Sequence, residues 1–95
     1  MKQVIAIFDS GVLPDVMQVL EQLEIARWTR LSGASGAGER NVREGNAIWP
    51  GLNEVLLIVL PPERVQPLID ACHAMRDSFP LRPGMRFIVS DCEIH

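Results

Sequence analysis

Two pairs of cysteine and histidine are the side chains best suited to metal binding in this 95-residue sequence. Cys92 and His95 have two residues between them, so a thiolate and an imidazole could bind one soft metal ion. Cys72 and His73 are adjacent in a stretch that predicts a helix, where neighbouring side chains point about 100° apart and do not readily share an ion. Matches this short are rarely sites. We therefore predict reduced, non-ligating cysteines and no metal site.

Motifs for catalysis are missing from the sequence. It contains no GxSxG, HExxH, Walker or dinucleotide-binding pattern. Asp9 and Ser10 could serve as an acid and a hydroxyl, but helix capping needs the same residue types. An acylphosphatase would need an arginine in the loop that follows the first strand, and Asp9-Ser10-Gly11 offers none. We predict a protein that is not an enzyme.

Hydrophobic periodicity predicts the elements that position these residues. Strands are expected at residues 3–9, 27–32, 54–60 and 85–92, and helices at residues 12–25 and 62–78. Between the second and third strands, Gly33–Leu52 is expected to be a loop without regular structure, because it begins with closely spaced glycines. Loops this long are generally functional or mobile.

The order of elements is β-α-β-β-α-β, which predicts an α+β fold of the ferredoxin-like type over a single domain, residues 1–95. We expect a four-stranded antiparallel sheet with two helices on one face. The right-handed crossover rule places the first and third strands in the centre. Those two segments are also the most apolar strands.

Both faces of the third strand are apolar. Alternation directs one set of side chains to one face and a second set to the other, respectively Leu56, Ile58, Leu60 and Val55, Leu57, Val59. Two helices can cover only one face, and monomers rarely expose a large apolar patch. We therefore expect the other face to be covered by a further copy of the chain.

Composition and charge limit the classes of partner that the protein could bind. A net charge of −3 with scattered basic residues argues against a nucleic-acid surface. The central strands carry aliphatic side chains in place of the exposed aromatics of an RNA-recognition domain. No apolar run is long enough to cross a bilayer, and the first residues show no signal-peptide pattern. A cytoplasmic location is the expectation.

Several segments together resemble one known family. They are Met1–Ile7 at the start of the chain, Leu13–Val16 at the first helix, Thr29–Gly33 leading into a glycine-bearing loop, and Phe87–Asp91 in the last strand. In order and spacing, the chain resembles the PII signal-transduction superfamily. The resemblance covers nearly the whole chain, is weak at each residue, and has no single diagnostic motif.

The resemblance implies a regulatory function connected with nitrogen. PII proteins are trimers of ferredoxin-like domains whose sheets face inward. ATP or ADP binds between subunits, and the T-loop after the second strand contacts a target, such as a transporter or an enzyme. For this chain the resemblance implies a homotrimer, with residues 33–52 as the T-loop and an adenine nucleotide as the ligand. The residues alone name no cofactor.

Site residues follow from the same resemblance, position by position. It places the ligand beside Gly33, Gly36 and Gly38 at the base of the loop, and beside Gly84 and Arg86 at the last strand. Arg86 replaces a phosphate-contacting lysine, and arginine binds phosphate well through paired hydrogen bonds. The residues expected to contact the target are Arg40, Arg43 and Trp49.

The chain also departs from the PII pattern. Where the family has a glycine-rich loop before its last strand, residues 79–85 hold one glycine and two prolines, and proline lacks an N–H donor. The loop has no tyrosine, because the chain has none. Two alternatives stay open: a trimeric metal-associated protein similar to the CutA family, which Trp49, Gly51 and Glu54 resemble, and an assembly module without a ligand.

Limited proteolysis tests the expected loop. Three glycines within six residues, Gly33 to Gly38, restrain the backbone little. Trypsin should therefore cut the folded protein first after Arg40 or Arg43, as mass spectrometry of the early fragments would show. First cleavage within residues 12–25 or 62–78 would contradict the assignment.

Overall fold

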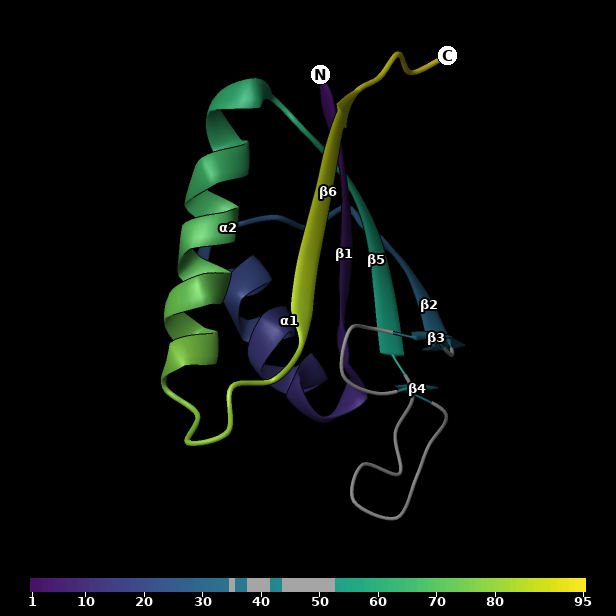
Figure 1. Cartoon of the computed structure of the whole chain (residues 1–95). Helices are drawn as coiled ribbons and strands as arrows, with labels where there is room; N and C mark the ends of the chain where they lie inside the picture. Colours follow the sequence, from purple (N-terminus) through teal and green to yellow (C-terminus); the bar gives the residue numbers. More distant parts are fainter. Residues whose placement is uncertain (35, 38–41, 44–52) are drawn as a thin grey trace.

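The computed structural model describes residues 1–34, 36–37, 42–43 and 53–95 (Figure 1). The elements, in chain order, are β1 (Lys2–Asp9), a 3₁₀ turn (Ser10–Val12), α1 (Leu13–Gln22), β2 (Thr29–Ala34), β3 (Gly36–Ala37), β4 (Val42–Arg43), β5 (Asn53–Leu60), α2 (Pro62–Asp77) and β6 (Met85–Asp91). Strands β1, β2, β5 and β6 form one antiparallel sheet.

The sheet has the strand order β2-β5-β1-β6, so the expected first and third strands are central. Both helices lie on the same side of it (Figure 1). The predicted fold, a four-stranded antiparallel sheet with two helices on one face, is confirmed. Each helix begins with a proline in its first turn, Pro14 in α1 and Pro62 in α2, where the missing N–H would be unpaired anyway.

The core lies between the sheet and the helices. In β5, the side chains of Leu56, Ile58 and Leu60 are at most 4% exposed. Their partners in β1 alternate in the same way, because Val4 pairs with Ile58. From the helices, Leu20 and Leu68 complete this layer at 1% exposure. One continuous apolar cluster thus joins both central strands to both helices.

Two predicted boundaries differ from the structure. The expectation of no regular structure after Gly33 is wrong, because β2 continues to Ala34 and β3 pairs with β4. The strand passes Gly33 by means of an irregularity between Leu31 and Ala34, where Gly33 takes a φ of 74° that glycine adopts freely. Most of the remaining loop lies outside the described residues.

The first helix is shorter than predicted. It ends at Gln22 and not at Ile25, because Glu24 takes a left-handed conformation with a φ of 58°. Helices commonly end in this conformation, although the residue is usually glycine. The sequence did not indicate this helix end, because a glutamate is not the residue expected in a left-handed conformation.

The sheet face away from the helices is apolar and lacks any covering element in the described part of the chain. The side chains on it alternate with the core residues, and they are Ile5, Ile7, Leu31, Val55, Leu57, Val59 and Ile88. On the edge strands, Leu31 is 54% exposed and Ile88 is 47% exposed. A patch of this kind marks an interaction surface. Among the described residues, neither helix has the length and hydropathy to cross a bilayer.

Candidate functional site

The end of the sheet where β1 stops is held by Asp9 and Gly84. The Asp9 N–H donates to the Gly84 carbonyl at 3.3 Å, and the Gly84 N–H donates to Oδ2 of Asp9 at 3.0 Å. Asp9 is only 6% exposed. A carboxylate that accepts a backbone N–H makes a strong, charge-assisted bond. The N–H of the predicted ligand residue Gly84 therefore already binds an anion supplied by the chain itself.

Arg86 follows Gly84 on the open face of the sheet. It pairs in register with Ile7, whose side chain also points away from the helices. Arg86 is exposed and takes part in none of the ion pairs found among the described residues. Its guanidinium is therefore available to a ligand anion or to a second copy of the chain.

Of the predicted glycines at the base of the loop, Gly33 lies on the opposite edge strand, β2. It precedes Ala34, the last residue of β2, and Ala34 pairs with Asn53 of β5. Asn53 pairs with Asp9 of β1, and Asp9 contacts Gly84. Gly33 and Gly84 thus lie at the same end of the sheet, but on its two edge strands.

Three strand spacings separate these edges, about 14 Å at the usual spacing of roughly 4.8 Å. Gly33 and Arg86 of one copy are therefore too far apart to contact the same phosphate. If both contact one phosphate group, they come from two different copies.

The structure places the remaining predicted residues only in part. Gly36 in β3 pairs with Arg43 in β4. Gly38, Arg40 and Trp49 lie outside the described residues. The predicted roles of all of them stay predictions.

Sequence reasoning missed a second buried carboxylate at this end of the sheet. Glu54 pairs with Phe8, points towards the helices and is 6% exposed. Its Oε2 is buried and has no hydrogen-bond partner among the described residues. The alternation of the strand could have predicted the burial of Glu54, because Glu54 shares its face with Leu56 and Ile58. Buried polar atoms without partners are rare and costly.

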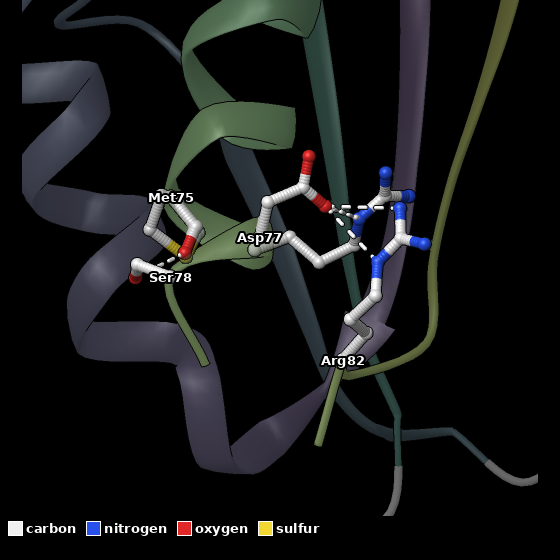
Figure 2. A network of polar contacts seen from close by, with 5 residues as sticks. Met75, Asp77, Ser78 and Arg82 are labelled. Carbon is white, nitrogen blue, oxygen red and sulfur yellow. Dashed lines mark hydrogen bonds and ion pairs between the residues drawn. The ribbon is translucent and has the colours of Figure 1, made fainter. Parts of the chain in front are cut away.

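A polar network fixes the chain between α2 and β6 (Figure 2). Oδ1 of Asp77 accepts from Nε of Arg76 at 3.2 Å and from Nε of Arg82 at 3.0 Å. It also forms an ion pair with Nη2 of Arg82 at 2.9 Å. Desolvation raises the pKa of Asp77, but the hydrogen bonds and charges of the two arginines outweigh it and lower the pKa overall. The Ser78 hydroxyl donates to the Met75 carbonyl at 2.6 Å and ends the helix. These contacts position the connection that leads to Gly84.

The pair Cys72 and His73 and the pair Cys92 and His95 do not combine into one metal site in the described part of the chain. Cys72 is 1% exposed in the core, and burial raises the pKa of its thiol to about 11. The His73 ring packs edge-on against Phe87, with centroids 5.7 Å apart. His95 lies 3.5 Å from the carboxylate of Glu93. Within the described part of the chain, no three histidine, cysteine or acidic residues are grouped as a metal site requires.

Comparisons with known proteins agree with this architecture. Solved structures of a PII-like nitrogen regulatory protein, CPII from Thiomonas intermedia K12, are similar to the chain. The form bound to ADP, AMP and bicarbonate has 15% sequence identity and a TM-score of 0.78, over 99% of this chain and 91% of that one. The form bound to ADP and bicarbonate has 17% identity and a TM-score of 0.79, over 98% and 86%.

The apo form of the same CPII protein has 13% identity and a TM-score of 0.66, over 94% of this chain and 87% of that one. No curated protein sequence matches the chain. The sequence model of the family described as nitrogen regulatory protein P-II matches residues 1–91. Since this match spans nearly the whole sequence, the chain belongs to the P-II nitrogen regulatory protein family.

Proposed function

We propose that the chain is a regulatory protein that binds an adenine nucleotide between copies of itself and acts on a target protein through residues 33–52. One observation carries the proposal: Gly33 and Arg86 lie at the same end of the sheet but on opposite edges. A contact between copies would bring such groups to the same phosphate. The CPII protein of the same fold is described as bound to ADP, AMP and bicarbonate.

The open sheet face supports the assembly. It carries the apolar side chains of Ile5, Leu57 and Ile88, and Arg86 lies on it too. Burial of such apolar area stabilises association by roughly 25 cal/mol for each Å². Three copies with their sheets facing inward, as the family resemblance implies, would cover this face and bring an edge of one copy towards Arg86 of the next.

The proposed role is regulatory and not catalytic, and a cytoplasmic location stays a prediction. The CutA-like alternative rests on Trp49 and Gly51, which lie outside the described residues, and on Glu54, which is buried in one copy. The match to the P-II family over residues 1–91 favours the nucleotide-binding proposal over it.

Arg86 gives the direct test of the nucleotide site. Arg86→Gln should weaken ADP and ATP binding roughly tenfold or more, because a hydrogen bond to a charged group contributes about 1.5–3 kcal/mol. Isothermal titration of the wild type and the variant would measure this. Arg27→Gln is the matched control, because Arg27 is exposed beside Val59 and Leu60, at the other end of the sheet. A wild-type protein that binds no adenine nucleotide at millimolar concentration would refute the proposal.

Asp9 should oppose nucleotide binding. Its carboxylate lies at the N–H of Gly84, so it would repel a phosphate placed there. Asp9→Asn keeps an acceptor for that N–H and removes the charge, and should tighten nucleotide binding roughly threefold to tenfold. Asp91→Asn, at the other end of β6, should leave the affinity unchanged. Weaker or unaltered binding by a folded Asp9→Asn protein would show that no phosphate lies near Asp9.

Leu57 tests the assembly separately. Leu57→Asp places a charge on the open face and should dissociate the trimer, because burying an unpaired charge costs several kcal/mol. Sedimentation velocity should show a change from trimer to monomer, while circular dichroism reports the retained fold. Leu81→Asp is the control, since Leu81 is 76% exposed between α2 and β6. A wild-type monomer at micromolar concentration would contradict the assembly.

A further inference from the structure

A groove runs between the end of α1 and the start of β2, on the helix side of the sheet. It has a volume of about 510 Å³ and an apolar floor that includes Met17, Leu20 and Trp28. The indole of Trp28 is exposed at 39% relative accessibility. Thr29, the next residue, pairs with Leu57, four residues along β5 from the Asn53 that pairs with Asp9. The groove is therefore separate from the sheet end and from the open face.

The only charged residues that line this groove, in the part of the chain that the structure describes, are Glu21 and Glu24. Both are exposed. They stand at the carboxyl end of α1, where the helix dipole is negative and acidic side chains are unfavourable. The last turn of α1 contains no basic residue. The negative charges of the two carboxylates and of the helix end therefore add together beside an apolar surface.

Glu24 is also an unfavourable residue for its backbone conformation. The Ile25 N–H donates to the Leu20 carbonyl at 2.8 Å, and the Glu24 N–H donates to the Glu21 carbonyl at 3.0 Å. This is the Schellman pattern, in which the residue at the position of Glu24 is left-handed and usually glycine. Its φ of 58° makes it the one described non-glycine residue with a positive φ. Fold stability alone would favour glycine here, so the carboxylate points to another role.

The neighbouring arginine does not neutralise the groove. Arg64 of α2 donates to the Leu23 carbonyl, so it satisfies one carbonyl at the end of α1. Arg64 lines a smaller hollow of about 230 Å³ on the other side of this turn, together with Arg27. Glu24 lines both hollows, whereas Glu21 lines only the larger one.

We infer that this groove binds a segment of a partner protein that carries a bulky apolar side chain next to lysine or arginine. The apolar side chain would pack on Met17 and Trp28. A lysine or arginine stem would lie along the same floor, with its charged head at Glu21 and Glu24. The indole face of Trp28 adds attraction for the cation. The acidic rim excludes segments with acidic side chains, so the charge sets the specificity.

Synthetic peptides test this with the whole chain. The probe is an amphipathic peptide with leucine on one face and flanking lysines; the comparison peptide has glutamate in place of each lysine. The Trp49→Phe background leaves Trp28 as the single tryptophan, so its fluorescence reports the groove. The lysine peptide should shift the Trp28 emission and bind more weakly as salt rises, since added ions screen exposed charges. The glutamate peptide should not bind.

Glu24→Gly separates a binding role from a structural one. Glycine suits the left-handed position, so the Tm should rise by a few degrees, while affinity for the lysine peptide should fall roughly fivefold. Glu21→Gln should weaken binding to a similar extent. Glu63→Gln, an exposed acidic residue in the first turn of α2, should leave it unchanged.

Four outcomes would overturn the inference. They are equal binding of the two peptides, unchanged affinity in Glu24→Gly, no Trp28 response to the lysine peptide at millimolar concentration, and a wild-type assembly that shrinks when Glu24 is replaced. The last outcome, seen by sedimentation, would mean that a second copy of this chain fills the groove. Nucleotide titration of Glu24→Gly should give wild-type values as long as the assembly keeps its size, because the groove lies away from Arg86.

Discussion

Two helices can cover only one face of a four-stranded sheet, and the central strands here are apolar on both faces. Leu56 and Ile58 are buried against the helices, while Leu57 and Val59 alternate with them on the open face. A single copy therefore leaves apolar surface in contact with water. Under the proposed assembly, the open face is the interface between copies, and Arg86 lies on it.

The end of the sheet shows how a chain of this family can lack the usual glycine-rich loop and still keep an ordered anion contact. The prolines before β6 remove N–H donors, and the donor that remains at Gly84 is bound by Asp9. Asp77 and its two arginines fix the approach to this point from α2. In the proposed site, a ligand phosphate would compete with this internal carboxylate, so its affinity would depend on Asp9 as well as on Arg86.

At the carboxyl end of α1, the residues that would stabilise the helix end differ from those that the proposed partner site requires. A glycine at Glu24 and a basic residue at Glu21 would each suit the helix end better. The chain has two glutamates there, beside an exposed indole. The Schellman bonds and the buried contact of Ile25 with the core hold the turn in place despite this cost.

The sequence by itself determined the number and order of the main helices and strands, the central strands and the presence of an open apolar face. Periodicity carries that information because it is a local property, as the alternation from Glu54 to Leu60 shows. Gly33 and Arg86 came from family resemblance, and only the strand order put them on opposite edges. The contact between Asp9 and Gly84 joins residues 75 positions apart, so no local pattern could signal it. The left-handed Glu24, the buried Oε2 of Glu54 and the groove beside Trp28 were likewise decided by tertiary packing, because each depends on contacts between separate elements.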